Sequence, residues 1–97
     1  MILEVLTPQK LLYRGHVNHV KMPGIGGSFG VLPQHAPLIS ALKKGSVEVT
    51  QNDAENKSFT DYEGTLLEDD ASKTKFSFSL NGGVVEVQKD KVIILAE

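Results

Sequence analysis

The sequence predicts an all-β protein, folded as a β-sandwich or a β-barrel. Apolar and polar residues alternate over several short segments, most clearly over 75–80 (KFSFSL), which places the apolar side chains on one face of a strand. Glycine and proline separate these segments at short spacing, and no window of useful length carries a sustained helical stripe. The chain has 97 residues, which is enough for one domain and too few for two. We therefore expect a single β-sandwich domain over residues 1–97.

The chain is expected to open with a short strand over residues 3–5. This strand should end at Thr7-Pro8, because proline has no N–H to donate to a neighbouring strand. Further along, residues 37–44 allow one short turn of helix, which Gly45 ends.

The middle of the chain combines one clear strand with polar segments. Residues 46–50 (SVEVT) alternate in the opposite phase to 75–80 and predict another strand. Residues 51–56 are polar enough to form a loop. The acidic run at 68–70 is typical of a loop tip that faces water.

The last part of the chain is expected to contain strands joined by tight turns. Asn81-Gly82-Gly83 predicts a β-hairpin that joins strand 75–80 to a strand around 85–87. Residues 89–90 predict a second tight turn. Four consecutive apolar residues at 92–95 predict a final strand that is buried on both faces.

Composition and charge exclude several classes of protein. Ten basic and twelve acidic side chains give a net charge of -2, whereas nucleic-acid binding needs a surplus of positive charge to displace counterions. The absence of cysteine excludes disulfides and thiolate metal sites. The first residues lack the regions of a signal peptide, and no apolar run approaches the ~20 residues of a membrane span. We expect a protein of a reducing cytosol with no direct membrane insertion.

Residues 23–39 (PGIGGSFGVLPQHAPLI) combine turn-forming residues with side chains that favour burial. A phosphate loop is excluded because no lysine follows the glycines, and Phe29 stands where a dinucleotide-binding fingerprint has its third glycine. Two interpretations remain: the apolar residues close one end of the core, or they form a surface that another protein covers. Pro33 and Pro37 stiffen the segment, and a stiff segment loses little entropy on docking.

Histidine often signals a metal site or a catalytic site, and the chain has three. His16 and His19 fall on opposite faces of a regular strand; a bulge between them would change this phase, but no third ligand is evident. Ser28 lies near His35 in the sequence, but there is no G-x-S-x-G turn and no acid placed to orient the histidine. We predict no metal, no cofactor and no catalytic residue.

Four blocks of the sequence resemble the ε subunit of F-type ATP synthases. Residues 23–39 are similar to the family pattern P-G-x-x-G-x-F/L-G-V/I-x-P-x-H-A-P-L. The other blocks are LEVLTPQKLLYRGHV at 3–17, LKKGSVEV at 42–49 and GGVVEVQKDKVIILAE at 82–97. They occur in the family's order and cover most of the chain, so that together they are highly specific.

The resemblance implies a flattened sandwich of two five-stranded sheets, with about ten strands in all. It also implies a non-catalytic subunit in the central stalk (rotor) of the synthase. Such a subunit binds the γ subunit and contacts the c-ring of the membrane sector, so that proton translocation is coupled to ATP synthesis. The implied location is peripheral, at the cytoplasmic face of the bacterial inner membrane.

The resemblance further implies two contact sites. The residues that would contact the c-ring are Gly26, Gly27, Ser28 and Phe29. Many relatives have an acidic residue where Ser28 stands, so a hydroxyl would replace a charge-assisted contact. The residues that would bind the γ subunit are Leu32, Gln34, His35, Ala36, Pro37 and Leu38.

The sequence departs from many family members in two respects. It reaches Glu97 without the C-terminal helical hairpin that binds ATP in some relatives, so we expect that helical domain to be absent and ATP not to bind. The segment between Val49 and Gly82 is longer than usual, which we interpret as a lengthened hairpin. A rival hypothesis is a stand-alone β-sandwich with ligand-binding or enzymatic activity, in which residues 23–39 only close the core.

Overall fold

The computed structural model describes residues 1–60 and 74–97, and this part of the chain is built almost entirely from strands. The all-β prediction is therefore confirmed, whereas the expected acidic loop tip at 68–70 lies outside the described residues. The elements are β1 (Ile2–Leu6), β2 (Leu11–Gly24), β3 (Gly27–Val31), β4 (Leu38–Leu42), β5 (Gly45–Gln51), α1 (Asp53–Asn56), β6 (Lys75–Leu80), β7 (Gly83–Gln88) and β8 (Lys91–Ala96).

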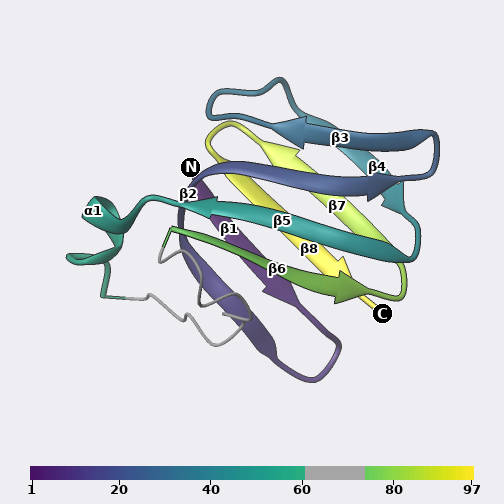
Figure 1. Cartoon of the computed structure of the whole chain (residues 1–97), viewed down its shortest axis with the longest axis horizontal. Helices are drawn as coiled ribbons and strands as arrows, with labels where there is room; N and C mark the ends of the chain where they lie inside the picture. The colour runs from purple at the N-terminus through teal and green to yellow at the C-terminus, as the bar shows by residue number, and fades with distance from the viewer. Residues whose placement is uncertain (61–73) are drawn as a thin grey trace.

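The strands form two packed layers, and Figure 1 shows β2, β5 and β6 crossing in front of β1, β7 and β8. The first layer consists of β4, β7, β8, β1 and the first half of β2. The second layer consists of β3, the second half of β2, β5 and β6. The described residues thus give eight strands, arranged as five and four with β2 counted in both layers, where the resemblance implied five and five.

The long strand β2 joins the layers because it bends as it passes from one to the other. Its 14 residues pair with β1 at one end and with β3 and β5 at the other. The pairing register with β5 shifts between Val17 and His19, and such a bulge bends a strand. At the opposite corner, Gly24 of β2 pairs with Leu42 of β4.

Two local predictions are wrong, namely a turn of helix and a β-hairpin. In each case the pairing between distant segments decides the structure. Residues 38–42 form the strand β4 rather than a turn of helix, since they pair with β7 along their whole length. The turn at Asn81-Gly82 exists, but it is not a hairpin: β6 pairs with β5, whereas β7 pairs with β4 and β8. The predicted turn at 89–90 does join antiparallel neighbours, β7 and β8.

The last strand, β8, was predicted to be buried on both faces, and this is also wrong. Val92 and Ile94 point into the core and are fully buried, whereas Leu95 is 50% exposed. The strand therefore has one core face and one outer face, although both faces are apolar.

The segment predicted as a loop at 51–56 contains the short helix α1. The Asn52 side chain caps it by accepting a hydrogen bond from the Glu55 N–H at 3.1 Å. The side chain of Asn56 then holds the helix against β2. Its Oδ1 accepts from the His16 N–H at 2.7 Å, and its Nδ2 donates to the His16 carbonyl at 3.1 Å.

The core lies between the layers and is filled by alternate side chains of both. Tyr13 is fully buried, its ring lies 5.0 Å from that of Phe76, and its hydroxyl donates a hydrogen bond of 2.7 Å to Gln51 Oε1. Within the part of the chain that is described, no helix is long and apolar enough to cross a membrane.

Candidate functional site

The residues predicted to contact the c-ring lie at the turn between β2 and β3 and in the first three residues of β3. Gly26, Gly27 and Ser28 are exposed, and Gly27 has a φ of 132°, which favours glycine. Phe29 instead turns inward and packs against the core. Its ring crosses Gly24, where a Cβ atom would lie 2.9 Å from the ring. The structure therefore presents three of these four residues at the end of the sandwich and uses the fourth to hold the turn.

The residues predicted to bind γ lie in the loop between β3 and β4, at the other end of β3, and at Leu38, the first residue of β4 (Figure 1). The loop is fastened by its own hydrogen bonds, including one of 3.2 Å from the His35 N–H to the Leu32 carbonyl. Gln34 has a φ of 66°, and Leu32 is 60% exposed. Leu38 is half-buried and packs against the core. The predicted set is thus brought together in space, but its last member faces inward.

Strand pairing extends this apolar loop across the outer face of the first layer. The register aligns one cross-strand row consisting of Ala41, Val84, Leu95 and Leu6. It aligns a second row consisting of Ile39, Glu86, Ile93 and Glu4. We call the six apolar residues of these rows the outer apolar face; they are Leu6, Ile39, Ala41, Val84, Ile93 and Leu95.

Exposure of the outer apolar face is large. Ile39 is 73% exposed, Leu95 is 50% exposed and Val84 is 40% exposed. Beside them, Pro37, Leu38 and Ile39 line an open hollow of about 380 Å³ together with residues of β7. Contiguous exposed apolar surfaces are typical of protein–protein contacts, membrane-interaction sites and ligand-binding grooves.

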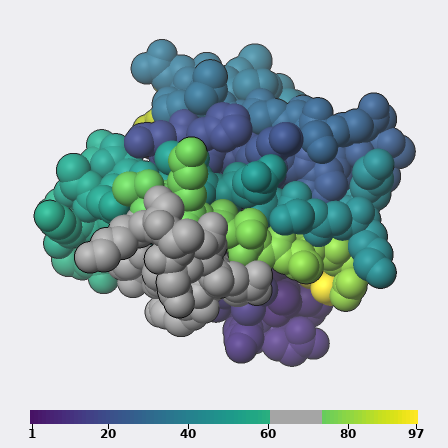
Figure 2. All heavy atoms as spheres, viewed as in Figure 1, coloured from purple at the N-terminus to yellow at the C-terminus, as the bar shows by residue number. Residues whose placement is uncertain are grey.

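The outer face of the second layer is polar by contrast. Its outward side chains on β5 and β6 include Ser46, Glu48, Thr50, Ser77 and Ser79. Figure 2 shows this face in space-filling form, with atoms of β5 and β6 spread across its middle. The two layers therefore expose chemically different surfaces, and only the first offers apolar contact area among the described strands.

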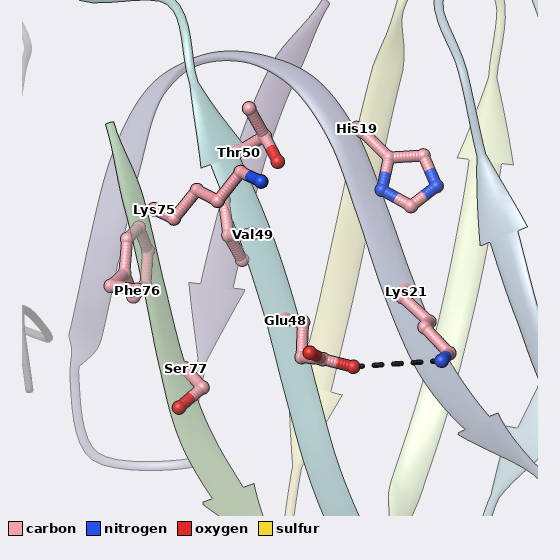
Figure 3. Close-up of a pocket in the computed structure, with 8 residues that line it drawn as sticks. All are labelled: His19, Lys21, Glu48, Val49, Thr50, Lys75, Phe76 and Ser77. Carbon is pink, nitrogen blue, oxygen red and sulfur yellow. Dashed lines mark ion pairs between the residues drawn. The ribbon is translucent and has the colours of Figure 1, made fainter. Parts of the chain in front are cut away.

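A second hollow, of about 280 Å³, lies on this polar face (Figure 3). His19 and Lys21 of β2 line one side, and Lys75 and Ser77 of β6 line the other. Its one ion pair joins Lys21 Nζ and Glu48 Oε2 at 3.7 Å. Among the described residues, no hydrogen bond links His19 to the hydroxyls of Thr50 and Ser77, which also line the hollow.

The bulge in β2 separates the two neighbouring histidines. His16 lies on the first layer under α1, with its Nδ1 2.9 Å from Glu55 Oε2 and its ring 4.7 Å from that of Phe59. His19 lies on the second layer and covers Gly30. Within residues 1–60 and 74–97, no three histidine, aspartate or glutamate side chains gather as metal ligands would.

A charged cluster adjoins the outer apolar face at Glu4. Although this residue is only 8% exposed, its Oε2 accepts hydrogen bonds from Arg14 Nη2 at 2.6 Å and Nε at 2.7 Å, and its Oε1 lies 3.1 Å from Lys91 Nζ. Burial raises the pKa of the Glu4 carboxyl, but the hydrogen bonds from Lys91 and Arg14 and their positive charges outweigh it and hold the pKa below its ordinary value.

Glu4→Gln is expected to lower the free energy of unfolding at pH 7 by about 1–3 kcal/mol, because hydrogen bonds to a charged group are lost. Since the folded state has the lower pKa, this stabilisation is present above the pKa of the unfolded chain, about 4.3, and is lost as the pH falls through the folded pKa. Urea unfolding of both proteins at several pH values between 3 and 7 tests this. Parallel pH profiles would contradict the assignment.

The sequence did not predict that Ile39 and Leu95 would be exposed, because their outward direction depends on strand pairing. Ile39 was part of the 23–39 segment, but its outward direction follows only from the pairing of β4 with β7. Leu95 was assigned to the core because it stands in an apolar run. The available signal was that GVVEVQ and KVIILA each contain more apolar residues than one core face needs.

Comparison with known proteins identifies the family. The model described as the beta-sandwich domain of the ATP synthase delta/epsilon chain matches residues 1–66. The ATP synthase epsilon chain of Chlorobaculum tepidum is 36% identical over 95 residues, which cover 98% of this chain and 86% of that relative. The ATP synthase epsilon chain of Desulforamulus reducens is 30% identical over 95 residues, which span 57% of its length.

Solved structures with the same fold come from larger assemblies. One is a chain in the central stalk and c-ring structure of Tetrahymena thermophila mitochondrial ATP synthase, with a TM-score of 0.67, 14% identity, and coverage of 99% of this chain and 62% of that chain. Another is a chain in the OSCP/F1/c-ring structure of Euglena gracilis mitochondrial ATP synthase, with a TM-score of 0.70, 18% identity, and coverage of 99% and 49%. At these identities the likeness shows the fold alone. The family model and the 36% identical relative together show that the chain belongs to the ATP synthase delta/epsilon chain family, in which it corresponds to the β-sandwich domain.

Proposed function

We propose that the chain is a central-stalk subunit of an F-type ATP synthase, which binds the γ subunit and contacts the c-ring so that proton translocation is coupled to ATP synthesis. As an epsilon chain it is a non-catalytic part of that complex. Its place is peripheral, at the cytoplasmic face of the bacterial inner membrane.

The exposure of the outer apolar face is the observation that supports γ binding on the first layer. The loop 32–38 leads directly into β4, so Ile39 continues the apolar surface of Leu32 and Pro37. Burying this surface against γ removes apolar area from water and stabilises the complex by roughly 25 cal/mol for each Å². The polar outer face of the second layer offers no comparable gain and is left to face solvent.

The turn between β2 and β3 is assigned to the c-ring. Gly26 and Gly27 have open space where a side chain would stand, which lets a partner approach the backbone closely. The neighbouring Ile25 is 65% exposed and adds apolar contact area. Strand β3 separates this turn from the γ-binding loop by roughly 15 Å, so one hairpin reaches both partners.

Site-directed cross-linking in the assembled synthase tests both assignments, because the chain has no cysteine of its own. We expect Ala36→Cys to cross-link to γ and Ser28→Cys to the c-ring, since both positions are exposed at the proposed contacts. Ser79→Cys, which is exposed on the second layer, is the matched control and should cross-link to neither.

Co-purification with the γ subunit tests the rival hypothesis of a stand-alone domain. Failure of the unmodified chain to co-purify with a co-expressed γ subunit would favour that rival. If Ser79→Cys cross-links to γ with the same yield as Ala36→Cys, γ also contacts the second layer, which would contradict its assignment to the first layer.

A further inference from the structure

Glu86 is a lone carboxylate in the middle of the outer apolar face. It stands on β7 between Ile39 of β4 and Ile93 of β8, with which it pairs across the sheet. Its side chain is half-buried and also lines the open hollow beside Pro37. Its cross-strand neighbours therefore offer it apolar contact and no charge.

The carboxylate of Glu86 has no partner on this chain. Within the described residues, none of the hydrogen bonds or ion pairs of the structure involves it. Glu4, two strands away in the same cross-strand row, shows the contrast, because Arg14 and Lys91 satisfy both of its oxygens. Lys91, a cation of the adjacent strand β8, is occupied by Glu4 and does not serve Glu86.

Covering this face with a purely apolar partner would therefore be unfavourable. A carboxylate that loses water without gaining a hydrogen bond or a positive charge is strongly destabilised, and this penalty offsets the gain from the surrounding apolar contacts. A partner that places a lysine or an arginine over Glu86 avoids this cost and gains a charge-assisted hydrogen bond.

We propose that Glu86 selects the partner surface: the γ subunit covers the outer apolar face with apolar side chains and sets one lysine or arginine against the Glu86 carboxylate. This inference rests on the proposed function, since it concerns the same γ contact. To the proposed contact it adds a positive charge on the γ subunit and identifies Glu86 as the residue that binds this charge.

The experiment measures the affinity of the full-length chain for the cognate γ subunit in complex with the catalytic subunits, by titration calorimetry at several salt concentrations. Glu86→Gln keeps the shape and removes the charge, so we expect Kd to rise by about 30-fold and its dependence on salt to flatten. Glu86→Lys should raise Kd further. Glu86→Asp, which keeps the charge, should bind more tightly than Glu86→Gln.

Two controls make the outcomes distinct. Glu48→Gln removes an exposed carboxylate from the second layer and should leave Kd within about 2-fold of the wild type, because rim and distant charges contribute little. Ile39→Asp tests whether γ binds the outer apolar face at all, since it should raise Kd if this face is the contact. Unfolding midpoints of all variants are measured in parallel, and Glu86→Gln should match the wild type because the carboxylate has no partner in the folded chain.

Wild-type affinity of Glu86→Gln, or tighter binding, overturns the inference if Ile39→Asp still loses affinity, and the proposed γ contact then stands. Equal losses in Glu86→Gln and Glu48→Gln also overturn it, because they show a general charge effect. If neither Glu86→Gln nor Ile39→Asp changes Kd, the γ contact on this face fails together with the inference.

Discussion

Replacing Ile39 by aspartate is expected to raise the Kd for the γ subunit by about 30-fold or more while leaving the chain folded. The side chain is 73% exposed on β4, beside the loop proposed to bind γ, so it has the position of an apolar anchor in the interface. An aspartate there would remove the apolar side chain from the contact and would lose water in the complex, whereas in the free chain it would face water. Titration calorimetry gives Kd, and urea unfolding should show a loss of stability below about 1 kcal/mol.

Leu42→Asp is the matched change on the same strand. Leu42 is 4% exposed and points into the core, so its aspartate would be buried without a partner in the folded chain itself. We expect this variant to lose more than about 4 kcal/mol of stability and to be largely unfolded. If Ile39→Asp unfolds the chain as Leu42→Asp does, or binds γ with wild-type affinity, β4 does not present Ile39 to a partner.

The pair also shows which features of the fold local sequence could predict. Alternation located strand 75–80 because one of its faces meets water and the other meets the core. The same reasoning failed for β4, where Ser40 shares the inward direction of Leu38 and Leu42 and obscures the pattern. It failed again for β8, because Ile93 and Leu95 make its outer face apolar as well as its core face.

Turn chemistry predicted where the chain changes direction but not which strands pair on either side of the turn. The turn at 89–90, where Asp90 has a φ of 63°, joins neighbouring strands as expected. Asn81-Gly82 has equally good turn chemistry, yet it carries the chain from one layer to the other. A turn reverses or redirects the backbone in either case, and the partner of each strand is chosen by distant segments.

The candidate site was predicted as a segment, whereas its surface depended on register. Residues 26–28 and residues 32–37 are each presented as one group because each group is contiguous in sequence, and the two groups lie at opposite ends of β3. Glu86 was part of an apparent strand with no assigned role, and its isolation among apolar neighbours follows from its pairing with Ile39 and Ile93. Register brings together residues more than 40 positions apart, which no local pattern encodes.

The largest loss of stability from removing a side chain without adding a charge is expected at Tyr13. Tyr13→Ala should lower the free energy of unfolding by about 3–5 kcal/mol, because it empties the space of a fully buried aromatic ring at the centre of the sandwich. The ring lies 5.0 Å from Phe76, so its removal strips contacts from β6 as well as β2. Urea unfolding with an unchanged slope would assign the loss to the folded state.

Tyr13→Phe separates the ring from its hydroxyl. The hydroxyl donates a hydrogen bond of 2.7 Å to Gln51 Oε1, and both groups are buried, so its loss is expected to cost about 1–2 kcal/mol while the ring still fills the core. Equal stability of Tyr13→Phe and Tyr13→Ala would mean that the polar contact, rather than the packing, holds β2 to the end of β5. Since Gln51 is the last residue of β5 and α1 follows directly, Tyr13→Phe should also increase hydrogen exchange in residues 52–56, which reports whether this bond fixes where the helix begins.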